Sequence, residues 1–385
     1  MPEAVDFSLL SGGFQYRLMR RIGLADRLVP RAVVLSALSW LPLVILSALQ
    51  GALIDSNNRI PLLGDFATYG RFLIAVPILV LTEKLVNRRI QDILQQFFTS
   101  KLIKDEEESA FLSAIQIADR QKDSFIAEIL MIGIAYTLVF IQIQVVTLNP
   151  ASVWYLQEET LDRLSPAGWW YALVSIPISQ FLLFRWLWRL IIWTGLLWRI
   201  SKLDLRLVPV HPDHAGGLGF LPLAQVPFAL IAFAGNTVIS SAMLNSIIYR
   251  GTNILSYAPV VIASVILSVL IFLAPLFVFI RKLICLRVRG TFDYTALSEG
   301  YVLLFNEKWI KGKNPKGESI LGTTDIQSLA DLANSFDIIR SIKAVPIDYN
   351  VVTIIAVASV LPMLPLILMV LPFSEIIKRL LGLAG

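Results

Sequence analysis

Seven apolar stretches, each long enough to cross a lipid bilayer as a helix, constrain the fold of this chain most strongly. A membrane-spanning helix needs about 20 predominantly apolar residues. The stretches cover residues 32–54, 66–86, 125–147, a fourth from about 168, 220–248, 260–280 and 351–371. Only 16% of the residues are charged, against about 25% in soluble domains. Because lipid offers no hydrogen-bond partners, apolar segments span it as helices. The sequence therefore predicts an all-α, polytopic integral membrane protein with about seven transmembrane helices.

Basic residues predict the orientation of the chain in the bilayer. Lys and Arg are frequent in the N-terminal segment and in the connections after the second, fourth and sixth stretches, and basic connections face the cytoplasm. The other connections carry one basic residue each, namely Arg59, Arg163 and Arg250. We therefore expect a cytoplasmic N-terminus and, with an odd number of spans, a periplasmic C-terminus. Lys378 and Arg379 in the C-terminal tail depart from this pattern.

The predicted spans divide the chain into six parts. These are a cytoplasmic N-terminal segment (1–31), spans one and two (32–86), a cytoplasmic helical hairpin (87–124), spans three to six with a glycine-rich loop at 211–219 (125–281), a cytoplasmic helical segment (282–349), and span seven with the C-terminal tail (350–385). Helical spacing of apolar residues predicts the hairpin, as in Ile90, Ile93 and Phe97 before its turn and Phe111 and Ile115 after it.

The glycine-rich loop contains the only two histidines of the chain, His211 and His214, on either side of Asp213. Imidazole and carboxylate groups bind zinc or iron, but no third ligand is evident, so we expect no bound metal. Asp213 can cap a turn, and the glycines after it permit positive φ angles. The alternative is a gate, a hinge or an anion cradle of backbone N–H groups. Its candidate residues are His211, Asp213, Gly216, Gly217 and Gly219.

Polar residues are concentrated in the fifth span. Polar side chains in a span face other helices or water rather than lipid, and small hydroxylated residues are also common at helix–helix contacts. Two interpretations therefore stay open, helix packing and the lining of a pathway. The candidate lining residues are Asn236, Thr237, Ser240, Ser241 and Asn245, with Gln142, Gln144 and Gln180 from neighbouring spans.

Arginine and tryptophan residues mark the cytoplasmic end of the fourth span. Arg185 lies about 26 Å down a helix that starts near Gly168, at 1.5 Å per residue. At that depth, arginine and tryptophan side chains form an interfacial belt. The alternative is a basic site for anionic lipid headgroups, with Arg185, Arg189 and Arg199 as candidates.

Several classes of function receive no support from the residues. No Asp or Glu lies in the central third of a span, since Glu83 and Glu128 are close to cytoplasmic ends, and many proton- and cation-coupled carriers use such a carboxylate. An ion conduit formed by this chain would therefore pass anions or would select poorly between ions. The single cysteine, Cys285, excludes an internal disulfide framework. We expect no cofactor and no nucleic acid partner.

Two motifs resemble an uncharacterised family of bacterial multi-span inner-membrane proteins. One is HPDHAGGLGFL at 211–221, and the other is GTTDIQSLADLANSFDIIRSIKAVP at 322–346, which contains the DIQSLADLANSF-type cytoplasmic helix. The resemblance implies a bacterial inner membrane and carries no catalytic residues with it.

Three hypotheses about function follow. The first is a channel or transport-related protein, homo-oligomeric in the bilayer, with the fifth span as its lining. The second is a non-transporting scaffold or sensor whose cytoplasmic hairpin binds a partner. The third is a lipid-acting enzyme, for which His211, Asp213 and Arg189 are the visible candidates.

Overall fold

In the computed structural model of the chain, helices and the turns and loops between them make up the part that it describes. The described residues are 7, 8, 12–21, 23–25, 27–54, 60–148, 153–157, 163–312 and 323–366. Within these ranges extended backbone forms only isolated bridges and no strand, which confirms the predicted all-α class. Arg59 and the C-terminal residues Lys378 and Arg379 lie outside the described ranges.

Six helical stretches are long and apolar enough to cross a membrane, counted over the described residues. They are Leu28–Leu49, Phe125–Gln144, Pro166–Ile200, Leu221–Arg250, Ile254–Ile310 and Tyr349–Leu366. The predicted second span forms α3 (Phe66–Thr68), η2 (Tyr69–Ala75) and the start of α4 (Val76–Thr99). This helix is not among the six.

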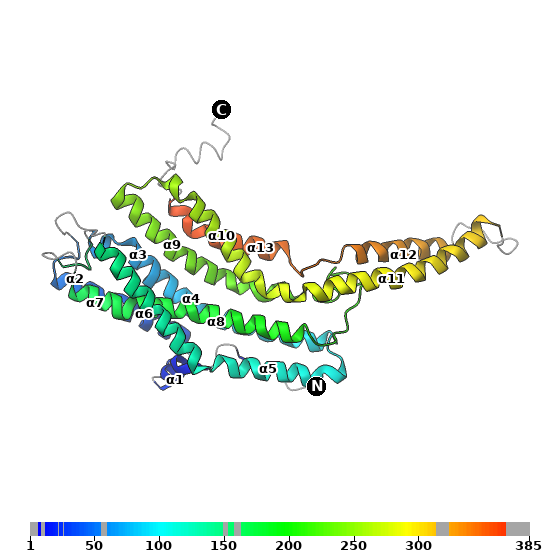
Figure 1. The fold of residues 1–385 in the computed structure, drawn as a ribbon, viewed down its shortest axis with the longest axis horizontal. Coiled ribbons are helices and arrows are strands. Elements are labelled where there is room, and N and C mark those ends of the chain that lie inside the picture. The colour runs from blue at the N-terminus through cyan, green and yellow to red at the C-terminus, as the bar shows by residue number, and fades with distance from the viewer. Residues whose placement is uncertain are drawn as a thin grey trace, which may run out of the picture.

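The helices pack as an elongated bundle in which the axes of α4, α8 and α9 are roughly aligned, with α9 antiparallel to the other two (Figure 1). The short helix α1 and the spans α2 and α6 border this centre. Helices α10 and α13 pack against each other beside α9. The bounds are Gly13–Arg21 (α1), Leu28–Leu49 (α2), Phe125–Leu148 (α6), Ile176–Ile200 (α8), Ala229–Arg250 (α9), Ala258–Leu273 (α10) and Tyr349–Val360 (α13). Large apolar side chains on α2, α6 and α10 are exposed, as lipid-facing residues are.

Two of the long helices contain a π turn that ends two residues before a proline. The π segment η2 precedes Pro77, and η4 (Tyr171–Ser175), which follows α7 (Pro166–Trp170), precedes Pro177. Proline has no N–H and its ring crowds the carbonyl one turn back, and a wider turn is one way to accommodate it within a helix. The guanidinium of Arg71 donates to the Tyr171 hydroxyl at 3.0 Å and joins the two segments.

Most of the additional structure is at one end of the bundle, where α4 and α8 end. We call it the basic end, and it is the end we predict to be cytoplasmic. There α5 (Glu108–Lys122) packs against α8, after the turn that follows α4. The arm, α11 (Ile280–Phe305) with α12 (Thr324–Arg340) packed along it, projects from this end (Figure 1).

Candidate functional site

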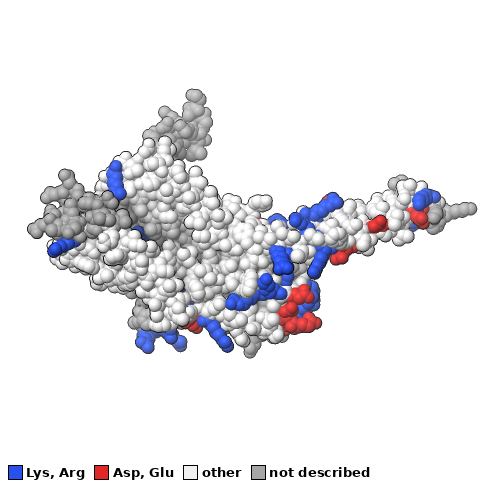
Figure 2. Space-filling model, in the orientation of Figure 1, with Lys and Arg blue, Asp and Glu red and all other residues white. Residues whose placement is uncertain are grey.

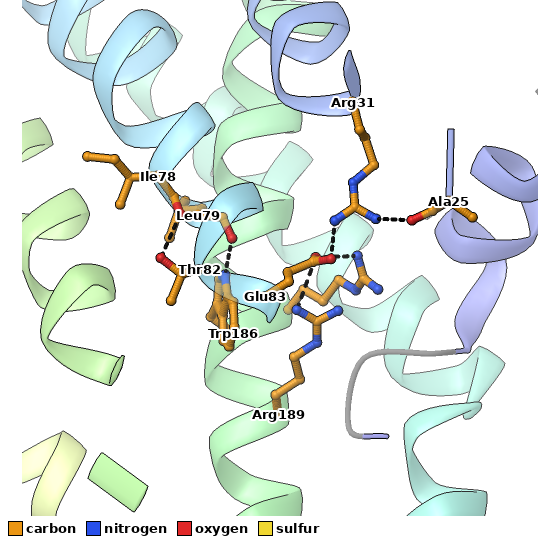
Figure 3. Close-up of polar contacts among 9 residues, drawn as sticks. Ala25, Arg31, Ile78, Leu79, Thr82, Glu83, Trp186 and Arg189 are labelled. Carbon is orange, nitrogen blue, oxygen red and sulfur yellow. Dashed lines mark hydrogen bonds and ion pairs between the residues drawn. The ribbon is translucent and has the colours of Figure 1, made fainter. Parts of the chain in front are cut away.

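The side chain of Glu83 lies inside the bundle in contact with three arginine side chains (Figure 3). Arg31 of α2 forms an ion pair with Oε2 of Glu83. Oε1 accepts from Nη1 of Arg189 at 3.2 Å and from Nη1 of Arg185 at 3.4 Å. All four residues are at most 6% exposed. We call these four residues the buried ion cluster.

Local geometry positions each member of the cluster. Arg185 and Arg189 are four residues apart and therefore lie on one face of α8. Between them, the Trp186 indole donates to the carbonyl of Leu79 at 2.9 Å and holds α8 against α4. The Arg189 guanidinium lies 4.8 Å from the centre of the Trp186 ring, a cation–π arrangement. The cluster therefore joins α2, α4 and α8.

Positive charge exceeds negative charge in the cluster. Three guanidinium groups surround one carboxylate, and the buried Glu128 of α6 attracts Arg185 electrostatically. Two buried nitrogens, Nε of Arg31 and Nη2 of Arg189, have no hydrogen-bond partner in the described part of the chain. Removal of one member of a buried ion pair costs about 3–5 kcal/mol, so this arrangement is a strong constraint on helix packing.

The position of Arg185 and Arg189 differs from the interfacial belt expected from the sequence. Both guanidinium groups point into the bundle toward Glu83 rather than toward headgroups, as Figure 3 shows for Arg189. The contact between Glu83 and Arg185 could have been predicted from the sequence by comparing how far along its helix each residue lies. Glu83 is 17 residues from the start of α3 and Arg185 is 19 residues from the start of α7, so both lie about 26–28 Å along their helices.

The glycine-rich loop is organised around Asp213. Its carboxylate accepts backbone N–H groups from Ala215 at 2.8 Å, Gly217 at 3.2 Å and Gly219 at 2.7 Å. Burial alone would raise the pKa of Asp213, but these hydrogen bonds and the His211 ring outweigh it and lower the pKa. The N–H groups that could cradle an external anion are thus occupied by the chain itself, which favours the structural interpretation.

The remaining loop candidates fit a packed turn at the base of the arm. Gly216 and Gly217 have φ angles of +66° and +101°, values that glycine adopts without strain. His214 contacts the Ser341 hydroxyl at 2.7 Å through Nδ1, and its carbonyl accepts the N–H of Lys343 at 2.9 Å. Among the described residues, no group of three or more His, Cys, Asp or Glu side chains is placed to hold a metal.

The candidate lining residues of α9 are engaged in contacts between helices. Asn236 donates to Ser268 of α10 at 3.0 Å and to the carbonyl of Ala232 at 2.8 Å. Ser240 donates to the carbonyl of Pro362 at 2.6 Å. Thr237 and Ser241 are buried as well and donate to carbonyls of their own helix. These contacts favour the packing alternative for α9.

The other sequence candidates are dispersed. Asn245 donates to Asp65 at 2.6 Å at the opposite end of the bundle from the buried ion cluster. Gln142 lines a small cavity of about 20 Å³ between α6 and the segment formed by α7 and η4, whereas Gln144 is exposed. Buried atoms of Gln180 and Arg199, Oε1 and Nη1, have no hydrogen-bond partner among the described residues. The structure does not bring these side chains together into one site.

No protein-family model, curated protein or solved structure matches the chain. The likeness to a bacterial inner-membrane family therefore stays a prediction. Composition and helices together establish a multi-span helical membrane protein embedded in a lipid bilayer.

Proposed function

We propose that this chain is a non-transporting membrane scaffold that associates with a second copy of itself along α10 and the arm. The observation that carries the proposal is an apolar stripe that continues from α10 into α11. Within α10 and within α11 its residues recur at intervals of four, as on one side of a helix, and Phe277 lies between the two helices in the 3-10 segment η7 (Ala274–Phe279). The stripe residues are Ile262, Ile266, Leu270, Phe277, Ile284, Val288 and Phe292, which are 37–71% exposed.

The arm needs a partner because it cannot cover its own apolar side chains. Phe292 is 71% exposed, and Leu303 and Ile310 further along are 59% and 72% exposed. An exposed apolar patch outside lipid is typical of a protein interface. The two helices of the arm pack on each other, but the stripe lies on another side of α11.

A second copy of the chain fits this stripe better than a soluble protein does. The stripe begins on a membrane-spanning helix and continues beyond it. A soluble partner could cover only the part outside the bilayer, whereas another copy carries the same stripe at the same depth. Two-fold symmetric dimers are also the commonest homo-oligomers among soluble proteins. The hydrogen bonds of Asn236 and Ser240 within the bundle do not favour transport.

Cysteine cross-linking in intact membranes tests the proposal. In a Cys285→Ser background, Phe292→Cys places a thiol on the stripe. Leu297→Cys, at a site 60% exposed, is the matched control, roughly 140° around the same helix. A short bis-maleimide should produce a covalent dimer with Phe292→Cys and little with Leu297→Cys. Equal cross-linking at both positions, or none at either, would overturn the proposed interface, as would a single copy per nanodisc.

A further inference from the structure

A cleft of about 530 Å³ lies at the foot of the arm, between the end of α8, the connection after it and the start of α11. Four basic residues line it, Lys202, Arg281, Lys282 and Arg289, with one acidic residue, Asp204. Figure 2 shows Lys and Arg side chains gathered where the arm leaves the bundle, next to a group of acidic side chains. The volume is within the range of small-ligand sites, about 300–1,000 Å³.

The positive charge of the cleft is only partly neutralised from within the protein. Asp204 is already paired with Lys104, which lies outside the cleft lining. Lys282 donates to the carbonyl of Leu203. Asp204 attracts Arg289 electrostatically, but neither Arg281 nor Arg289 forms a hydrogen bond or a close ion pair in the part of the chain that the structure describes. The cleft therefore presents two exposed guanidinium groups to an anion.

The cleft lies where the apolar part of α8 and the apolar run before α11 are followed by basic residues. No charged residue occurs between Arg250 and Arg281 along the chain, or between Arg189 and Arg199 on α8. Basic residues that directly follow an apolar span lie at headgroup depth. Trp198 is 52% exposed, with Lys202 Nζ 5.2 Å from its ring centre, and tryptophan is enriched at the same depth.

We propose that this cleft binds the phosphate group of an anionic phosphate ester, supplied by a phospholipid headgroup or by a soluble phosphate. Arginine binds phosphate oxygens through paired N–H groups, and Arg281 and Arg289 supply two such forks. The apolar part of the lining, which includes Val278 and Leu286, suits the glycerol and upper acyl region of a lipid. Basic pockets between helices bind anionic headgroups by this combination.

The only cysteine of the chain reports on occupancy, because Cys285 lines the cleft and is exposed. The full-length protein is placed in nanodiscs of phosphatidylcholine alone, in nanodiscs that also contain phosphatidylglycerol, and in phosphatidylcholine nanodiscs with inorganic phosphate. The rate of Cys285 alkylation by N-ethylmaleimide is then measured. Occupancy of the cleft at about ten times Kd should slow alkylation roughly tenfold.

Variants distinguish binding in the cleft from a general charge effect. The double variant Arg281→Gln/Arg289→Gln should lose the protection, whereas Lys311→Gln at the exposed tip of the arm should keep it. Protection only with phosphatidylglycerol supports the lipid as the source, and protection by inorganic phosphate supports a soluble source. Equal alkylation rates in all three conditions, or protection that persists in the double variant, would overturn the proposal. Thermal unfolding of each variant checks that the fold is intact.

Discussion

The carboxylate of Glu83 can be buried inside the bundle only because positively charged side chains surround it. An unpaired buried charge is costly, so a buried carboxylate is found with positive groups around it. Arg31, Arg185 and Arg189 supply that environment. In the sequence the four residues look like ordinary charges near the ends of spans. The three arginines are 52, 102 and 106 residues from Glu83 along the chain, so sequence spacing does not indicate that they contact it.

Replacement of Glu83 should therefore destabilise the bundle more than loss of any exposed acidic residue. In Glu83→Gln three guanidinium groups lose their counter-charge, and we expect a loss of about 3–5 kcal/mol in the free energy of unfolding. The midpoint of thermal unfolding in detergent measures it. Asp92→Asn, at an exposed position on the same helix, is the control and should change little. An unfolding midpoint equal to that of the wild type in Glu83→Gln would contradict the role of the cluster.

Asp213 should make the stability of the glycine-rich loop depend on pH. Its pKa in the folded protein is lowered relative to about 3.9 in an unfolded chain. The ionised form therefore stabilises the fold above the unfolded pKa, and this contribution is lost as pH falls through the lower folded value. Asp213→Asn should cost about 2 kcal/mol near neutral pH, since hydrogen bonds to a charged acceptor are lost.

The pH series itself is the test of that role. The difference in unfolding midpoint between the wild type and Asp213→Asn should stay constant down to about pH 5 and shrink at lower pH. The unfolded carboxyl takes up its proton near its pKa of about 3.9, and the folded carboxyl does so only at its lower pKa. Asp293→Asn, at an exposed position on α11, serves as the control. A difference that stays constant across the series would show that the charge of Asp213 does not hold the loop.

At the scale of elements, local sequence explains the π turns, whereas contacts with neighbouring helices explain the polar face of α9. Pro77 and Pro177 remove one backbone donor each, and the π turns before them accommodate the two rings. Asn236 and Ser240 on the polar face of α9 donate hydrogen bonds to α10 and to the segment after α13, while the buried Oδ1 of Asn236 has no hydrogen-bond partner among the described residues. Polarity in a span is thus compatible with packing alone, and neighbouring helices decide between packing and a pathway.

Truncation of the α9 side chains should lower stability without a change in flux. Asn236→Ala and Ser240→Ala each remove a contact between separate helical segments, worth about 0.6–1.7 kcal/mol in the membrane. Thermal unfolding and anion flux in proteoliposomes are measured together. Ile239→Ala, at a position 36% exposed on the same helix, controls for truncation. Altered flux with unchanged stability would restore the pathway interpretation.

At the scale of the whole molecule, the two ends of the bundle differ. The buried ion cluster, the glycine-rich loop, the basic cleft and the arm all lie at or toward the basic end. At the opposite end, segments are joined by individual hydrogen bonds, such as the one that the Trp154 indole donates to the Asp65 carboxylate at 2.9 Å. A scaffold that associates through its arm would use this asymmetry to present its interaction surface on one side of the membrane.

The sequence by itself determined that this chain is a helical membrane protein and where its apolar helices lie. Both follow from local properties, namely the length of an apolar run and the lack of hydrogen-bond partners in lipid. Only the tertiary structure decided that Arg185 and Arg189 turn toward Glu83, that α5 lies against α8, and that α11 and α12 form a separate arm. These outcomes depend on which helix faces meet, and pairing between distant segments is set by the packing of the whole bundle rather than by the residues near each one.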